Sequence, residues 1–202
     1  MKEPNYEKQM RTRNGIISAL TDLAEEKPVS SITVNQICDR AGIHRSTFYR
    51  YFETVEIMIR TMEDEFLESY ERFCNDIDFS IGPTLSSRES FKNMIMFYAD
   101  NKETARFLLF RNEDRAFFDK YVSVMRSYYI KFMEDSGVWF EGPNMDYYID
   151  YAIGGTVHCL RQFLDGKYSD IEGMLDFMFE LGIANPRKEY VRSAKRRKKE
   201  SL

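Results

Sequence analysis

Hydrophobic residues recur at spacings of three and four along almost the whole chain. This spacing places apolar side chains on one face of a helix, whereas a half-buried strand would alternate apolar and polar residues. Strand-like alternation is scarce, and only five prolines interrupt the 202 residues, which suffice for one large or two small domains. The pattern predicts an all-α fold of about nine helices.

Capping and stop residues indicate where the helices begin and end. Thr33, Thr54 and Asn101 are expected to cap the N-termini of the helices that follow them, and Gly42 and Gly166 to terminate the helices before them. Ser-x-x-Glu patterns of the capping-box type begin at Ser86 and Ser169. The predicted helices cover residues 7–25, 34–41, 45–52, 55–76, 86–98, 102–110, 114–134, 145–164 and 169–182.

Charge is distributed unevenly along the chain. Residues 1–60 carry a net charge of +1, residues 61–185 carry −11 and residues 186–202 carry +6, which together give the overall −4. The acidic middle repels a polyanion, so any nucleic-acid contact belongs at an end of the chain. The basic end is expected to be a disordered, solvated tail, and the alternative is that it makes auxiliary phosphate contacts.

Several classes of protein are disfavoured by what the sequence lacks. No apolar run reaches about 18 residues and the N-terminus has no signal-type stretch, so we expect a cytoplasmic protein without a membrane span. Cys38, Cys74 and Cys159 form no CxxC pair, which argues against a disulfide framework and against a zinc site. No phosphate loop, nucleophile motif or metal-ligand spacing is present, so we expect no catalysis, no metal and no cofactor.

The stretch GIHRSTFYRYF, residues 42–52, has the composition of a binding surface. Phe48 and Phe52 are its core candidates, and the polar and aromatic side chains between them would point outward from a helix-turn-helix. Arg45 can bind the edge of a guanine in a major groove, while Tyr49 and Tyr51 can donate to phosphate oxygens. The predicted DNA-binding residues are Thr33, His44, Arg45, Ser46, Thr47, Tyr49, Arg50 and Tyr51.

The longer segment SITVNQICDRAGIHRSTFYRYFETVEIMI resembles the DNA-binding segment of the TetR/AcrR family of bacterial transcriptional regulators. The resemblance rests on the matched positions Thr33, Ile37, Cys38, Ala41, Gly42, Ile43, His44, Arg45, Ser46, Thr47, Phe48, Tyr49, Tyr51 and Phe52. Two positions depart from the family pattern. Val55 stands where the family usually places a phosphate-binding lysine, and His44 replaces a smaller capping residue.

The resemblance implies a homodimer that binds a palindromic operator in double-stranded DNA. It divides the chain into a DNA-binding domain, residues 1–53, a regulatory and dimerisation domain of the Firmicute type, residues 54–185, and the basic tail, residues 186–202. The last two predicted helices would form a four-helix bundle with their two-fold mates. The expected interface residues are Gly154, Gly155, Leu160, Phe163, Leu164, Met174, Phe177, Met178 and Leu181, and the alternative is that they pack within one subunit.

The family resemblance also implies a repressor that a small-molecule effector releases from DNA. A helix-turn-helix regulator whose C-terminal domain binds a partner protein is the alternative. Aromatic and methionine side chains at helical spacing are the candidate lining of an effector pocket, although such residues are more often plain core. These candidates are Met62, Phe66, Phe91, Ile95, Tyr98, Phe107, Tyr121, Met125, Tyr128 and Tyr148.

Overall fold

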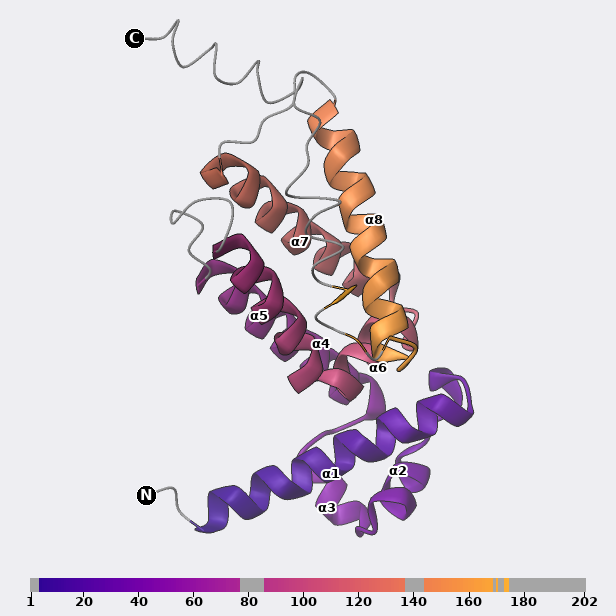
Figure 1. The fold of residues 1–202 in the computed structure, drawn as a ribbon. Helices are drawn as coiled ribbons and strands as arrows, with labels where there is room; N and C mark the ends of the chain where they lie inside the picture. Colours follow the sequence, from indigo (N-terminus) through magenta and orange to yellow (C-terminus); the bar gives the residue numbers. More distant parts are fainter. Residues whose placement is uncertain (1–3, 77–85, 137–143, 169, 171–172, 175–202) are drawn as a thin grey trace, which may run out of the picture. The chain divides into compact units, whose positions relative to one another are not determined.

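The computed structural model describes residues 4–76, 86–136, 144–168, 170 and 173–174, and this part contains α-helices but no strand (Figure 1). The all-α prediction is confirmed. The helices are α1 (Pro4–Glu26), α2 (Val34–Ala41), α3 (Arg45–Tyr49), α4 (Val55–Asp76), α5 (Ser86–Asp100), α6 (Lys102–Phe110), α7 (Arg115–Ser136) and α8 (Asn144–Leu164), with a short 3₁₀ turn, η1 (Val29–Ser31), before α2.

Most predicted boundaries agree with these helices to within a few residues. α4 and α6 begin and end where the sequence pattern places them, and α3 is shorter because it ends at Tyr49. The Thr54 hydroxyl accepts from the Ile57 N–H at 3.1 Å, as expected of a cap. Asn101 occupies the N-cap position of α6, but its side chain makes no capping hydrogen bond, so that expectation was wrong. The ninth helix, predicted over residues 169–182, falls almost entirely outside the described residues.

The chain divides into two compact units. The N-terminal unit consists of residues 1–68 and 101–115, and the C-terminal unit consists of residues 69–100 and 116–202. α4 therefore contributes its first part to one unit and its last part to the other, and α6 belongs with the N-terminal helices. These units do not coincide with the domains expected from the sequence, whose boundaries remain a prediction.

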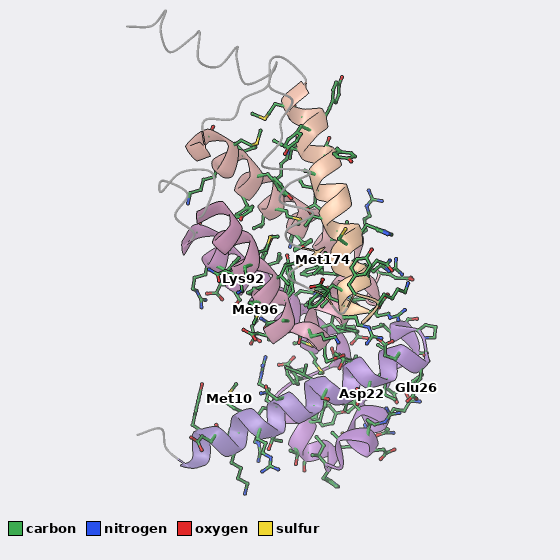
Figure 2. The ribbon with its side chains drawn as sticks, viewed as in Figure 1. Met10, Asp22, Glu26, Lys92, Met96 and Met174 are labelled. Carbon is green, nitrogen blue, oxygen red and sulfur yellow. The ribbon has the colours of Figure 1, made fainter. Side chains whose placement is uncertain are left out.

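The N-terminal unit is built on a small apolar core. Ile16, Leu20, Ile37 and Phe48 are fully buried, because the helical period of α1, α2 and α3 turns these side chains inward. Ion pairs then join the helices at the surface. Arg40 reaches Glu26 at 2.7 Å, near the C-terminal end of α1, where Asp22 and Glu26 are labelled in Figure 2.

Glu25, also at this end of α1, holds α6 and the turn after it. Its carboxylate accepts from Arg106 at 2.6 Å and from Arg111 at 3.0 Å. The buried Glu63 of α4 accepts from Asn112 at 2.7 Å. These contacts explain why residues 101–115 pack as part of the N-terminal unit.

The C-terminal unit has a core rich in tyrosine. The hydroxyls of Tyr98 and Tyr121 lie 2.6 Å apart, and the ring centroid of Tyr70 is 5.2 Å from that of Tyr121. Burial raises the pKa of all three phenols above the usual value of 10. A second hydroxyl pair, Tyr129 with Thr156 at 2.7 Å, joins α7 to α8.

α7 and α8 run side by side and also share charge-assisted contacts (Figure 1). Arg126 of α7 donates to Asp146 and Asp150 of α8. The two acceptors are one helical turn apart, so a single guanidinium fixes the register of the pair. No helix in the described part of the chain is long and apolar enough to cross a membrane.

Candidate nucleic-acid interface

The turn between α2 and α3 is defined by local hydrogen bonds. Thr33 and Gln36 form a reciprocal capping box at the start of α2, in which the Thr33 hydroxyl accepts from the Gln36 N–H and the Gln36 side chain accepts from the Thr33 N–H. Gly42 ends α2 with φ 64°, a left-handed conformation that glycine adopts without steric cost. The helix-turn-helix therefore follows from short-range signals in the sequence.

His44 caps α3, the helix predicted to contact DNA. Its Nδ1 lies 3.3 Å from the Ser46 backbone nitrogen and 2.9 Å from the Ser46 hydroxyl, and the backbone N–H donates to the ring. An Nδ1 that accepts this bond carries no proton, so the neutral ring carries its proton on Nε2. The unusual histidine thus performs the function of the smaller capping residue and leaves an N–H donor on its other nitrogen.

Arg45 and Tyr49 form a pair on the exposed face of α3. Arg45 donates to the Tyr49 hydroxyl at 3.2 Å, and its guanidinium carbon lies 5.9 Å from the centre of the Tyr49 ring. The hydrogen bond to Tyr49 also raises the pKa of Arg45 above its usual value. Tyr49 is 48% exposed although its neighbour Phe48 is fully buried. The pair limits the conformations of a side chain predicted to contact bases.

Tyr51 differs from the expectation. Its hydroxyl is buried and has no hydrogen-bond partner in the described part of the protein, and Arg50 lies over its ring at 5.3 Å. In this conformation the phenol cannot donate to phosphate, so the predicted role does not fit the geometry. The reason is that Tyr51 follows the end of α3, where the chain turns toward α4 and carries the hydroxyl inward.

The remaining predicted contacts lie at or near the surface. His44, Arg45, Ser46, Arg50 and Thr33 are exposed, while Thr47 is half-buried. Between them these side chains and Tyr49 offer cationic and neutral hydrogen-bond donors but no acid. This combination suits phosphate oxygens and the acceptor groups of base edges.

The start of α4 offers less to a phosphate than the sequence indicated. Val55, which stands at the family's lysine position, is buried. Hydrogen bonds from the Glu56 backbone and from the Thr54 hydroxyl lower the pKa of the Glu56 carboxyl, so this group stays charged in the first turn of α4. The negative charge and the Thr54 cap both compete with an anion for the same N–H groups.

Comparison with known proteins agrees with this geometry. Residues 16–58, which span the C-terminal half of α1, the helix-turn-helix and the start of α4, match the family described as bacterial regulatory proteins, tetR family. These residues form a DNA-binding domain of the TetR type. No curated protein matches the chain at the level of sequence.

Two solved structures show the same fold as this chain. The dihydroxyacetone kinase operon activator DhaS is 20% identical, with a TM-score of 0.55 over 86% of this chain and 95% of its own. The fatty acid degradation regulator FadR from Bacillus halodurans is 14% identical, with a TM-score of 0.63 over 93% of this chain and 98% of its own. At these identities the likeness concerns the fold.

The residues predicted to line an effector pocket are distributed over both units. Met62, Phe66 and Phe107 lie in the N-terminal unit, whereas Ile95, Tyr98, Tyr121, Met125, Tyr128 and Tyr148 lie in the C-terminal unit. The side chain of Phe91 lies outside the described residues. All of the others except the half-buried Tyr148 are buried. Tyr128 also lines a hollow between α4 and α7.

The other residues of that hollow were missed by sequence reasoning. They come from two helices about fifty positions apart in the chain, and most are polar, so they do not belong to the pattern of aromatic and methionine side chains at helical spacing. No local pattern in the sequence brings the two sets together. They are Glu71, Cys74, Asn75, Val124, Ser127 and Lys131.

The predicted dimer interface is also divided. The chain itself buries Leu160, Phe163 and Leu164, so these side chains pack within one subunit. Gly154 and Gly155 are exposed, and a Cβ added at either would meet no atom within 4 Å. Met174 is half-buried. Phe177, Met178 and Leu181 lie outside the described residues.

Proposed function

We propose that this TetR-family regulator is a homodimeric repressor that binds a palindromic operator through α3 and leaves it when a small-molecule effector binds. The observation that carries the proposal is the exposed surface of α3, where Arg45, Tyr49 and the capping His44 are held by hydrogen bonds within the helix. Donors already held in place lose less side-chain entropy on binding, which favours sequence-specific contact over loose electrostatic attachment.

Dimerisation is proposed through the exposed face of α8. Tyr147 and Tyr151 are 67% and 75% exposed, and Gly154, Gly155 and His158 continue the same face at helical spacing. Glycines let a second helix approach closely, and the large exposed aromatics beside them bury much area. The proposed seam therefore replaces Leu160 and Leu164, which the subunit already buries, with the two tyrosines.

Effector control is proposed to act through α4, because that helix contributes residues to both units. A ligand that favours one position of its C-terminal part changes the preferred spacing of the two recognition helices. Ligand binding and DNA binding then oppose each other with the same coupling free energy in both directions.

The direct experiment is to select duplexes from a randomised pool with the full-length protein and to measure affinity for a selected and a scrambled duplex by mobility shift. We expect a two-fold symmetric consensus and a clear preference for the selected duplex. Arg45→Ala should relax that preference, while Lys120→Ala, which removes one exposed charge from α7, should leave it intact. A pool that yields no consensus would reject the proposal.

A further inference from the structure

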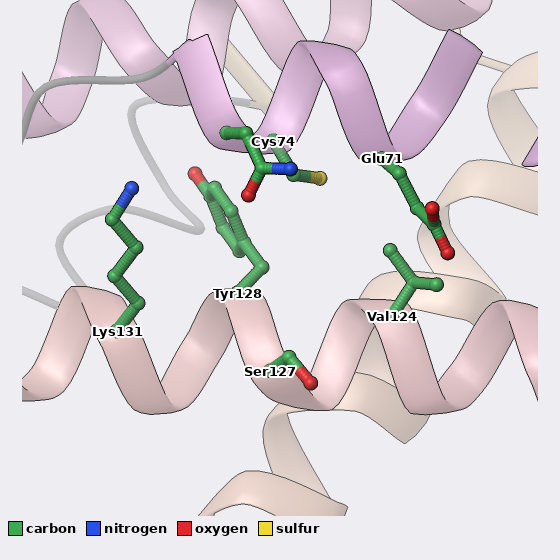
Figure 3. A pocket seen from close by; sticks show the side chains of 7 residues that line it. Glu71, Cys74, Val124, Ser127, Tyr128 and Lys131 are labelled. Atoms are coloured by element: carbon green, nitrogen blue, oxygen red, sulfur yellow. The ribbon is translucent and has the colours of Figure 1, made fainter. Parts of the chain in front are cut away.

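The C-terminal unit contains a hollow of about 280 Å³ between α4 and α7 (Figure 3). Cys74 of α4 and Tyr128 of α7, each 7% exposed, are its buried lining residues, and Val124 adds an apolar side chain. The volume lies just below the range of about 300–1,000 Å³ that is usual for ligand sites. It suits a small metabolite and is too small for a long acyl chain or a multi-ring compound.

The hollow is bipolar. Glu71 of α4 and Lys131 of α7 lie at opposite ends of it, with Cys74 and Tyr128 between them (Figure 3). Both charges act on the same thiol, since Glu71 raises the pKa of Cys74 and Lys131 lowers it, although burial is the largest cause of its rise to about 12. A thiol with that pKa is protonated and unreactive at neutral pH, so Cys74 contributes shape and not covalent chemistry.

We propose that this hollow binds a small zwitterion, whose anionic group pairs with Lys131 and whose ammonium group pairs with Glu71. Val124 would contact the methylene groups between the two charges, and Ser127 and Asn75 add neutral hydrogen-bond groups at the rim. A ligand with only one charge would leave the opposite charge of the hollow partly desolvated and unpaired, which disfavours its binding.

The ligand would bridge the C-terminal part of α4 to α7. Because α4 continues without interruption from Val55 in the N-terminal unit to Asp76 in the C-terminal unit, a ligand that holds this end of the helix acts on the element shared by both units. This step rests on the proposed function, since it identifies the hollow with the effector site. The binding chemistry itself depends only on the hollow.

The test is calorimetric titration of the full-length protein with unbranched amino acids of increasing length: β-alanine, γ-aminobutyrate, δ-aminovalerate and ε-aminocaproate. We expect at least one of them to bind with a dissociation constant in the millimolar range or below. Caproate and hexylamine, which carry one charge each, should bind at least about tenfold more weakly. If no amino acid of the series binds, or if the singly charged compounds bind equally well, the proposal is wrong.

Variants locate the site. Glu71→Gln and Lys131→Met should each weaken binding at least about tenfold, whereas Asp64→Asn on α4 and Lys120→Met on α7 should not change it. The double variant Glu71→Lys with Lys131→Glu should bind the zwitterion again, because the ligand can bind in the reversed orientation. Unchanged affinity in Lys131→Met, or no recovery in the double variant, would overturn the assignment.

Mobility shifts with the selected duplex separate this proposal from the proposed function. Specific DNA binding without zwitterion binding would reject the hollow as a ligand site and leave the regulator intact. Zwitterion binding without specific DNA binding would reject the regulator and leave the ligand site. If both occur, the bound amino acid should lower DNA affinity by the same factor by which DNA lowers amino-acid affinity.

Discussion

The hydrogen bond from Arg45 to Tyr49 gives one hydroxyl two roles at the scale of single residues. A phenol accepts through its lone pairs while it donates its proton, so Tyr49 can hold Arg45 and still donate to a phosphate. Tyr49 thereby connects two predicted contacts: that of Arg45 with a base, which depends on the DNA sequence, and its own with a phosphate, which does not. His44 has a similar double role, because one ring nitrogen caps α3 and the other faces away from that bond.

Tyr49→Phe is therefore expected to weaken binding to every duplex and also to reduce the preference for the selected one. The uniform loss comes from the phosphate donor, and the reduced preference comes from a less constrained Arg45. Arg45→Ala should relax preference at one base pair per half-site, at a cost of roughly 1–3 kcal/mol. Competition between selected and scrambled duplexes measures both effects. If Tyr49→Phe leaves the preference unchanged, Tyr49 does not position Arg45.

Tyr51→Phe is expected to stabilise the fold by about 1 kcal/mol, because it removes a buried hydroxyl whose hydrogen-bonding capacity is not satisfied. DNA affinity should stay unchanged, since the hydroxyl does not reach the surface. Denaturant unfolding and mobility shift together check this prediction. A loss of affinity at unchanged stability would show that Tyr51 rotates outward when DNA binds.

At the scale of the helices, residues at the helix ends define the short helices, whereas contacts between helix faces define the long ones. α2 and α3 are short, and their geometry depends on Thr33, Gly42 and His44, each of which satisfies or ends a helix terminus. α7 and α8 are long, and their register depends on Arg126 and on the Tyr129–Thr156 pair. The exposed face of α8 is left with two tyrosines and two glycines.

Gly155→Leu is expected to fold and to be monomeric. A Cβ added at this position would meet no atom within 4 Å apart from the backbone of its own helix, and replacing a mid-helix glycine removes a cost of roughly 0.5–1 kcal/mol. The same side chain would block a second α8 from approaching. Sedimentation should show a dimer for the wild-type protein at micromolar concentration and a folded monomer for the variant.

The matched control is Lys120→Leu, an exposed substitution on α7 that should leave the dimer intact. DNA binding should decrease in parallel with dimerisation in Gly155→Leu, because a monomer can contact only one of the two half-sites. A wild-type protein that sediments as a folded monomer at high concentration would contradict the proposed interface.

The buried tyrosines are expected to control alkaline unfolding of the whole molecule. Burial raises the pKa of Tyr129 to about 12 and the pKa of Tyr98 and Tyr121 further, so the folded protein retains protons that the unfolded chain releases above pH 10. The stability that these buried, protonated phenols contribute is fully present below pH 10, and it is lost as the pH rises through their folded-state pKa values. For Tyr129 the loss amounts to about 3 kcal/mol.

Phenolate absorbance from these residues should therefore appear together with the loss of helical circular dichroism. Tyr129→Phe should move this transition to higher pH, because it removes one group that favours the unfolded state in base. If the buried phenols ionise while the helical signal persists, the tyrosine core does not limit alkaline stability.

The charge distribution of the whole chain predicts a steep dependence of DNA binding on salt. Each phosphate neutralised by the N-terminal unit lowers log affinity by about 0.9 per unit of log salt. The acidic stretch of residues 61–185, at −11, cannot supply such contacts. Removing residues 187–202 should lower affinity modestly and leave sequence preference intact, because a run of lysine and arginine side chains binds the charge of the phosphates and does not distinguish bases. A truncated protein without preference would place the tail among the specificity-determining parts.

The sequence by itself determined the helices and the DNA-binding segment. Periodicity, the Thr33 and Thr54 caps and the left-handed Gly42 act over at most four residues, so they can be recognised without knowledge of the rest of the chain. The exposed character of Arg45 and Tyr49 follows from the same period. These short-range signals account for the predictions of α2, α4 and α6, whose boundaries the structure reproduces.

Only the tertiary structure decided which side chains pack against other helices of the same subunit and which remain exposed. The inward hydroxyl of Tyr51, the burial of Leu160 and the hollow between Glu71 and Lys131 depend on how helices distant in sequence pack. An apolar residue on a helix face can meet its own subunit or a partner, and the helical period is identical in both cases. Packing, which depends on the shapes of all neighbours together, distinguishes the two.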